Sequence, residues 1–405
     1  MKIYNIFIII ISIKICTSFN FNPPKIIKNI INTNPNFQVT NKNDFYRLGL
    51  NPILNDINKY GELTWYPIGL PNEFTYKNPK KVTIKDVNYI IWKDNNGFYG
   101  LRDACSHQGS SFQGGNIIND TISCPYHGYI FNGTCGQLLE IPKMIIKQND
   151  CYNVKSFKVV EIDGIVFMNT IPLTLENYNL IDSKYIWIEP ESTDPKQKVI
   201  VLTEIFEHYA KFVTVNSLDI CHIGFVHTFG NKNNPIPLSN THIQNCNDST
   251  YHYKIAYEYL AGDKSIVNYL YNFTNITVEN EYVQPHTTVA RVLFGNFSST
   301  IITIAQPISQ FKTRLFVKAY RNYWYFHNST NIFENIHNFF INNIGNLLTY
   351  YTMFETLKQD KKIIDNIDKT DYKTMHGKFS IKYDMLGNHY KHNYKKFFEY
   401  DDNTL

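Results

Sequence analysis

The sequence is poor in cysteine and has no block of basic residues. Seven cysteines in 405 residues form no closely spaced framework, and the odd total leaves at least one unpaired, which disfavours a disulfide-stabilised secreted domain. Lys and Arg total 39 against 35 Asp and Glu, so we expect no nucleic-acid partner. With 43% hydrophobic and 18% charged residues, the chain is unlike a disordered polymer, and its length suffices for two domains.

Long apolar runs are also missing, including at the N-terminus. The stretch from Ile6 to Ile13 is too short to span a bilayer and resembles the apolar region of a signal peptide. Residues 19–43 contain no Asp or Glu, as is typical of transit peptides. We predict a signal-like segment at 1–18 and a transit-like leader or linker at 19–60, similar to the bipartite plastid-targeting leaders of algae. A simple secretory signal or a membrane-associated helix is the alternative.

Residues 61–172 have a strand-rich pattern. Apolar residues alternate around Val82 and Ile84, and the turns Asn95-Asn96-Gly97 and Asp163-Gly164 are typical of hairpins. We therefore predict a small antiparallel β domain in this part of the chain.

The pattern changes after a linker that contains Pro190 and Pro195. Residues 173–370 predict an α+β domain in which a long amphipathic helix, carrying Ile336 to Phe354, closes the fold. Residues 371–405 are polar, and we expect a solvated C-terminal extension. The other elements predicted here are a helix at 203–223 and strands at 251–259, 287–294, 300–305 and 314–320.

Two Cys-His pairs lie in the β domain. They are Cys105-Ser106-His107 and Cys124-Pro125-Tyr126-His127-Gly128. Tetrahedral zinc accepts the same four donors. However, each pair supplies one thiolate and one imidazole, so a two-iron cluster can take both thiolates on one iron and both imidazoles on the other, as in a Rieske centre. Gly114-Gly115 and Gly128 allow tight turns beside the sulfur atoms, which favours the [2Fe-2S] cluster over zinc.

A second constellation starts at Asn216. On a helix, Asn216, Asp219 and His222 would share one face, and Gly224 could end the helix so that His227 folds back toward His222. Two imidazoles and one carboxylate form the facial triad that binds mononuclear Fe(II) and leaves positions open for O2. The pattern predicts such a site.

These motifs, with the preceding Trp65-Tyr66-Pro67-Ile68-Gly69, resemble those of Rieske-type non-haem iron oxygenases. The resemblance implies an antiparallel Rieske domain followed by an α+β catalytic domain of the helix-grip, or START-like, kind. Departures from the family pattern are Gln108 in place of Arg and Tyr129 in place of Trp. Ser110 and Tyr126 stand where respiratory Rieske proteins have a disulfide, which places this centre with the oxygenases.

The same resemblance implies roles for individual residues. Cys105, His107, Cys124 and His127 would bind the cluster, and His222, His227 and a carboxylate of the closing helix would bind Fe(II). Among the acids in that region, we choose Asp360; the others are Glu355, Asp365 and Asp368. Asn216 and Asp219 are the candidate catalytic residues. An acid at position 219 would connect His222 to the cluster His127 of a neighbouring subunit, which implies a ring-shaped homotrimer.

The segment from Asn216 to His227, with the following Thr228-Phe229-Gly230, looks most like the branch that contains pheophorbide a oxygenase and chlorophyllide a oxygenase. We therefore expect an oxygenase that uses O2 to oxidise a chlorophyll-derived tetrapyrrole in a plastid. No flavin or nicotinamide fingerprint is present, so a separate ferredoxin would supply electrons. The alternatives are an oxygenase or desaturase of sterols or lipids, and an inactive electron-transfer or binding protein.

Overall fold

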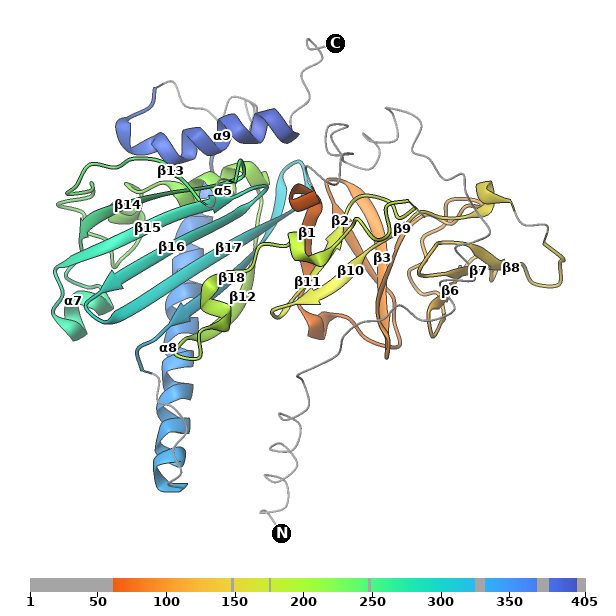
Figure 1. The fold of residues 1–405 in the computed structure, drawn as a ribbon, viewed down its shortest axis with the longest axis horizontal. Helices are drawn as coiled ribbons and strands as arrows, with labels where there is room; N and C mark the ends of the chain where they lie inside the picture. Colours follow the sequence, from red (N-terminus) through yellow and green to blue (C-terminus); the bar gives the residue numbers. More distant parts are fainter. Residues whose placement is uncertain are drawn as a thin grey trace. The chain divides into compact units, whose positions relative to one another are not determined.

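The computed structural model describes residues 61–146, 149–174, 176–246, 249–324, 332–369 and 379–398. The predicted leader at 1–60 therefore lies outside the described residues. The strand-rich pattern of the N-terminal half gives three small antiparallel sheets (Figure 1). Their strand orders are β1-β11-β10, β2-β3-β4-β9 and β5-β6-β7-β8. These strands are β1 Trp65–Gly69, β2 Lys80–Ile84, β3 Val87–Asp94, β4 Gly97–Arg102, β5 Ile117–Ile118, β6 Thr121–Ser123, β7 Ile130–Asn132, β8 Leu138–Glu140, β9 Ser156–Phe157, β10 Val159–Ile162 and β11 Ile165–Asn169.

The predicted hairpins form at the predicted turns. Asp94 Oδ1 accepts hydrogen bonds from the peptide N–H groups of Asn96 and Gly97, which closes the turn between β3 and β4. Asp163 and Gly164 both have positive φ, at 49° and 77°, as a two-residue hairpin of primed type requires. The local turn chemistry therefore sets the strand register in this region.

The C-terminal half is built on one seven-stranded antiparallel sheet with the order β12-β18-β17-β16-β15-β14-β13 (Figure 1). Its strands are β12 Lys198–Phe206, β13 Gln244–Asn245, β14 His252–Leu260, β15 Asn275–Val283, β16 Thr287–Phe294, β17 Phe297–Ser309 and β18 Lys312–Arg321. The α+β fold predicted from the sequence is thereby confirmed. The domain limits predicted at residues 172 and 370 stay predictions.

The helix predicted at 203–223 is wrong over its first part. Residues up to Phe206 belong to β12, which pairs along its whole length with β18, and the helix α5 begins only at Ala210. The sequence Lys198–Phe206 is rich in β-branched residues, and pairing with β18 stabilises the extended form. A helical spacing of apolar residues between Phe206 and Leu218 was therefore a misleading signal across a strand-helix boundary.

The helices are α5 Ala210–Leu218, α6 Ile223–Val226, α7 Ile266–Tyr271, α8 Ile332–Ile364 and α9 Met385–Phe398, with single 3-10 turns η2 Gly61–Thr64, η3 Pro71–Glu73, η4 Asp150–Tyr152, η5 Ser183–Tyr185, η6 Pro190–Thr193 and η7 Lys382–Asp384.

The expectation of a solvated C-terminal extension is wrong for α9. Leu386, Tyr390 and Phe397 of this helix are buried, and the Tyr390 hydroxyl donates to the carbonyl of Pro285 over 2.9 Å. Few apolar residues suffice because their spacing of three and four places them on one face.

The two faces of the large sheet contact different partners. Phe316 packs in a core with strands of the N-terminal sheets, whereas the adjacent Val317 packs with Leu357 and Ile364 of α8. Successive residues of a strand point to opposite faces, so β18 contributes to both cores. Strands of the N-terminal sheets thus pack against one face of β16 to β18, and α5 and α8 lie against the other face.

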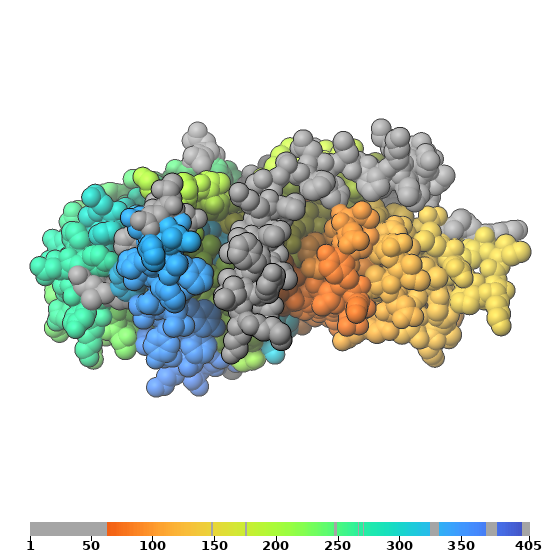
Figure 2. All heavy atoms as spheres, turned by 90° about the horizontal axis from the view of Figure 1, so that it is seen from below, coloured from red at the N-terminus to blue at the C-terminus, as the bar shows by residue number. Residues whose placement is uncertain are grey.

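Helix α8 is held to the sheet by a buried arginine. Arg321, only 1% exposed, donates to Asn346 Oδ1 over 2.7 Å and to the carbonyl of Asn342 over 3.2 Å. Helix α8, drawn in blue, lies at the surface (Figure 2). Large apolar side chains of its N-terminal half are exposed. These are Ile332, Phe333, Ile336, Phe339, Phe340, Ile344 and Leu347. No helix in the described part of the chain is both long and apolar enough to cross a membrane.

Candidate metal centres

The two Cys-His pairs lie in two loops with the same backbone pattern. The peptide N–H of Cys105 donates to the carbonyl of Ser110, and that of Gly109 donates to the carbonyl of Cys105, both over 2.8 Å. In the second loop Cys124 donates to Tyr129 over 2.8 Å, and Gly128 donates to Cys124 over 2.9 Å. The two loops therefore present their Cys and His side chains in equivalent ways.

Both loops need a glycine at the same place. Gly109 and Gly128 have φ of 72° and 75°, which a residue with a side chain adopts only with strain. The sequence analysis identified Gly128 and missed Gly109, although its spacing from Cys105 equals that of Gly128 from Cys124.

The two imidazoles lie together, and the two thiols are neighbours. Nδ1 of His107 lies 3.2 Å from Nδ1 of His127, and both imidazoles are exposed. Cys105 and Cys124 are buried free thiols. Burial raises the pKa of the Cys105 thiol, and the neighbouring Cys124 thiol adds to this effect, so that the pKa is about 11. Two buried sulfur donors and two exposed nitrogen donors fit a [2Fe-2S] cluster whose imidazole-bound iron faces the surface.

The second site begins where α5 ends. The helix stops at Leu218, so Asn216, Asp219 and His222 do not share one helical face as predicted. Asp219 Oδ1 instead accepts the peptide N–H groups of Cys221 over 2.9 Å and His222 over 3.3 Å. This turn leads into the short helix α6, with His222 and His227 at its two ends.

Gly224 has a different role from the predicted one. It lies inside α6 and does not end α5. A Cβ at this position would lie 2.8 Å from the carbonyl oxygen of Asn231 and 2.8 Å from Pro235. Gly224 thus allows the following loop to pack against α6, and this turn brings His227 back toward His222.

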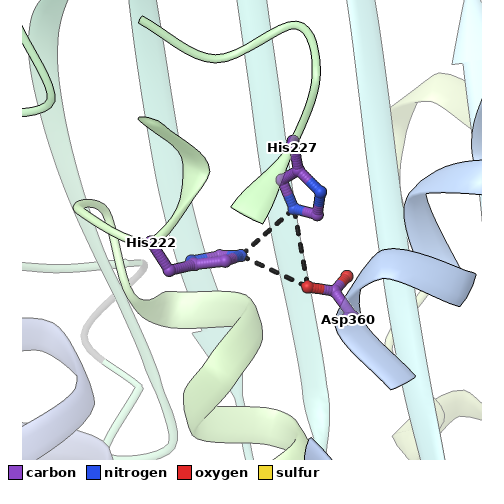
Figure 3. Close-up of side chains that lie close together, drawn as sticks. All are labelled: His222, His227 and Asp360. Carbon is purple, nitrogen blue, oxygen red and sulfur yellow. Dashed lines mark hydrogen bonds and ion pairs between the residues drawn. The ribbon is translucent and has the colours of Figure 1, made fainter. Parts of the chain in front are cut away.

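His222, His227 and Asp360 come together at one point (Figure 3). The Nε2 atoms of the two histidines are 3.2 Å apart, and Asp360 Oδ1 lies 3.5 Å from each. Among the described residues, this is the one group of three or more His, Cys, Asp or Glu side chains whose donor atoms all lie within 4.8 Å of one another. Asp360 comes from α8, far along the chain from the two histidines.

Hydrogen bonds orient both imidazoles toward this point. His222 Nδ1 lies 2.7 Å from the carbonyl oxygen of Asp219, which only accepts, so Nδ1 carries the proton. His227 Nδ1 lies 3.1 Å from the side-chain oxygen of Gln359 and donates in the same way. Both Nε2 atoms then present lone pairs toward the Asp360 carboxylate. Three electron-rich atoms in contact fit a cation, and two imidazoles with one carboxylate fit Fe(II).

The two histidines differ in their electrostatic surroundings. Burial lowers the pKa of His222, but the neighbouring Asp360 carboxylate, together with Asp219, outweighs burial and raises it. At His227 burial is the larger effect and the pKa is lowered, despite the charge of Asp360. A lowered pKa keeps His227 neutral, as a metal ligand must be.

Other acids of the closing helix have different partners. Asp365 forms an ion pair with Lys361 over 2.6 Å and accepts the peptide N–H of Glu207. Glu355 forms an ion pair with Lys358 over 3.2 Å. Asn216, which the sequence motif highlighted, donates to Asp360 Oδ1 over 3.2 Å. Gln359 was missed as a functional residue because a lone glutamine beside an acid carries no distinctive sequence signal.

A cavity of about 610 Å³ adjoins the three ligand candidates. His222, His227 and Asp360 lie in its wall. Most of the other lining residues belong to β14 to β18 and α8, where apolar side chains such as Ile301, Val317 and Leu357 alternate with polar ones. Its size is typical of a site for a small organic molecule.

Comparison with known proteins agrees with the geometry of the first site. Residues 64–158 match the model of the Rieske [2Fe-2S] domain. The chain therefore contains a Rieske domain. This match confirms the resemblance predicted from the two Cys-His pairs and the predicted [2Fe-2S] cofactor.

Relatives of parts of the chain have several activities. Cholesterol 7-desaturase nvd of Xenopus laevis is 30% identical over 131 residues, which is 31% of this chain and 27% of the relative. Chlorophyllide a oxygenase of Chlamydomonas reinhardtii, a chloroplastic protein, is 26% identical over 178 residues, which is 40% of this chain and 24% of the relative. The matched segments thus span less than a third of each relative.

The likeness in three dimensions extends beyond the Rieske domain. The crystal structure of dicamba monooxygenase bound to dicamba superposes with a TM-score of 0.65 at 18% identity, covering 84% of this chain and 97% of the other. Another structure of dicamba monooxygenase contains non-haem iron. The chain therefore shares the fold of dicamba monooxygenase over most of its length.

Proposed function

We propose that this protein is a Rieske-type oxygenase that uses O2 to oxidise an apolar small molecule. The convergence of His222, His227 and Asp360 in the wall of an apolar cavity carries this proposal, because an electron carrier would need no such site. Iron bound there would activate O2 beside the substrate.

The residues of the chain have separate tasks. His222, His227 and Asp360 hold the iron, and Asn216 positions the Asp360 carboxylate through its amide. Cys105, His107, Cys124 and His127 hold the cluster that receives electrons, and a separate ferredoxin-type donor supplies them. The apolar cavity wall excludes water from the reacting atoms.

Electrons would pass between subunits of a homotrimer. The Asp219 carbonyl accepts from His222, and one carboxylate oxygen accepts two peptide N–H groups. No described residue of the chain hydrogen-bonds with the other carboxylate oxygen, which leaves it available to His127 of a neighbouring copy, whose ring is exposed. This arrangement supports a head-to-tail ring.

A chlorophyll-derived tetrapyrrole of the chlorophyllide a or pheophorbide a class is the first candidate substrate. The segment from Asn216 to Gly230 supports this choice, and so does the likeness to chlorophyllide a oxygenase. With a chloroplastic relative and the transit-like leader, we propose that the protein works in a plastid. A sterol is the second candidate, because cholesterol 7-desaturase nvd is also similar to part of the chain.

Turnover by the full chain tests the proposal. The protein, purified without air, is reduced with ferredoxin and its reductase and given chlorophyllide a, pheophorbide a or cholesterol. We expect substrate-dependent O2 uptake and an oxidised product with one of the three, and loss of both in the variant His222→Ala. A variant of the exposed His337, His337→Ala, is the matched control. If none of the three is oxidised while both iron centres are loaded, the proposed substrate classes are wrong.

A further inference from the structure

One side of the cavity carries a cluster of polar groups. Tyr257 and Tyr259 are two residues apart on β14 and therefore point to the same face. Asn280 of β15 pairs with Ile255 and lies diagonal to Tyr257, a separation that an aromatic side chain spans. All three residues line the cavity.

These groups are buried and lack hydrogen bonds. Tyr257, Tyr259 and Asn280 are 3%, 5% and 2% exposed. Within the described part of the chain, no group hydrogen-bonds with either hydroxyl or with Asn280 Oδ1. The Asn280 side chain lies near Tyr257 and the Asn231 peptide lies near Tyr259, but neither contact has the geometry of a hydrogen bond. Because such groups cost free energy when unpaired, three of them in one cavity wall require a partner.

Most other hydroxyl, amide and carboxylate side chains of the wall already have hydrogen-bond partners. Thr288 and Thr303, also in the wall, hydrogen-bond with each other over 2.7 Å. Lys264 is the one cation of the cavity lining among described residues, and it is exposed. Apart from the iron proposed at His222, His227 and Asp360, a carboxylate next to Tyr257 and Tyr259 would therefore find no buried countercharge, which is unfavourable. A neutral oxygen would avoid this cost.

We propose that Tyr257, Tyr259 and Asn280 form a subsite for a neutral oxygen substituent, a hydroxyl or a ketone, of an otherwise apolar ring system. This inference rests on the proposed function, since it takes the cavity as the substrate site. A ligand hydroxyl accepts from a tyrosine and donates to Asn280 Oδ1. A ketone only accepts, so it needs the tyrosines and not the Asn280 oxygen.

Binding to the full chain tests the subsite without turnover. The probes are two pairs, each with and without the oxygen: cholesterol against cholestene, and pheophorbide a against its derivative without the ring ketone. Trp324 lines the cavity, so tryptophan fluorescence reports binding. We expect wild-type protein to bind the oxygen-bearing member of one pair about 3- to 10-fold more tightly, as a hydrogen bond of ordinary strength provides.

Variants assign this preference to residues. Tyr257→Phe and Tyr259→Phe should each remove most of the preference for the oxygen-bearing probe and leave the affinity for its counterpart unchanged. Asn280→Leu should reduce the preference for a hydroxyl, which donates to the Asn280 oxygen, more than the preference for a ketone, which does not. This difference separates the sterol from the tetrapyrrole. Tyr253→Phe, on the same strand but outside the cavity wall, is the matched control.

Two results would overturn the subsite. One is equal affinity of wild-type protein for both members of each pair. The other is a loss of affinity in the tyrosine variants that is the same for both members, because that loss reports a change of cavity shape. Either result can occur in a protein that still shows substrate-dependent O2 uptake, so failure of the subsite is distinct from failure of the proposed function.

Discussion

The side-chain oxygen of Gln359 lies 3.1 Å from Nδ1 of His227. This contact fixes the ring so that Nε2 faces Asp360, the next residue of the same helix. One turn of α8 therefore supplies both a metal-ligand candidate and the group that orients another.

Removal of this oxygen should weaken iron binding. Loss of a hydrogen-bond partner that orients a metal-binding histidine typically lowers metal affinity by about 10- to 100-fold. Gln359→Leu should therefore lower Fe(II) affinity within that range. Gln359→Glu keeps an acceptor at the same place and should retain affinity. Titration of the apo protein with Fe(II) measures both. Equal affinity of Gln359→Leu and wild type would show that the contact does not orient His227.

The choice of Asp360 as the third ligand is tested by iron content. Wild-type protein should hold about three iron per two acid-labile sulfides, from the cluster and the mononuclear site. Asp360→Ala should lower this ratio to about two per two, because two imidazoles alone bind Fe(II) weakly. Asp365→Ala is the comparison, since Asp365 pairs with Lys361. If iron were lost from Asp365→Ala and retained in Asp360→Ala, Asp365 would be the third ligand and the choice of Asp360 would be wrong.

The ion pair between Glu73 and Arg314 connects the two halves of the chain, and its contribution to stability depends on pH. Burial alone raises its carboxyl pKa, but hydrogen bonds from Arg314 of β18 and from Lys80 outweigh burial and lower the pKa from 4.5 to about 2. Ionised Glu73 therefore stabilises the folded protein fully above pH 4.5, and this stabilisation disappears as the pH falls toward about 2. Because the group is partly exposed, we expect about 1–3 kcal/mol.

Glu73→Gln should reduce this pH dependence. Thermal unfolding followed between pH 5 and pH 3 should show a smaller decrease of the midpoint in the variant than in wild type. The exposed Glu161 of β10 provides the control Glu161→Gln, which should behave as wild type. If the unfolding midpoints of Glu73→Gln and wild type decreased equally with pH, Glu73 would not be the source of this pH dependence.

Two helical glycines should respond oppositely to alanine. A Cβ at Gly345 of α8 would lie 2.6 Å from the buried Arg321 guanidinium, whereas at Gly387 of α9 the nearest atom is 3.5 Å away. Gly345→Ala should therefore destabilise by about 1–3 kcal/mol through displacement of Arg321. Gly387→Ala should stabilise by about 0.5–1 kcal/mol through helix propensity. Differential scanning calorimetry distinguishes them, and stabilisation by Gly345→Ala would refute the role of Arg321.

Short-range chemistry made much of this protein predictable. The Cys-x-His and Cys-Pro-Tyr-His-Gly motifs predicted the Rieske domain because their donors lie close in sequence, and Asp163-Gly164 predicted a hairpin because a two-residue turn depends on local backbone preferences. The spacing of His222 and His227 indicated a paired metal site for the same reason. Each of these features depends mainly on residues that are close together in the sequence.

Long-range packing decided the rest. Residues 198–206 are a strand because β18 pairs with them, and Met385–Phe398 is a packed helix because the sheet offers a surface for Leu386 and Tyr390. The convergence of Asp360 with two histidines more than 130 residues earlier depends on where α8 crosses the sheet. The polar cluster of Tyr257, Tyr259 and Asn280 is equally invisible in the sequence, because only the register of β14 and β15 brings its members together.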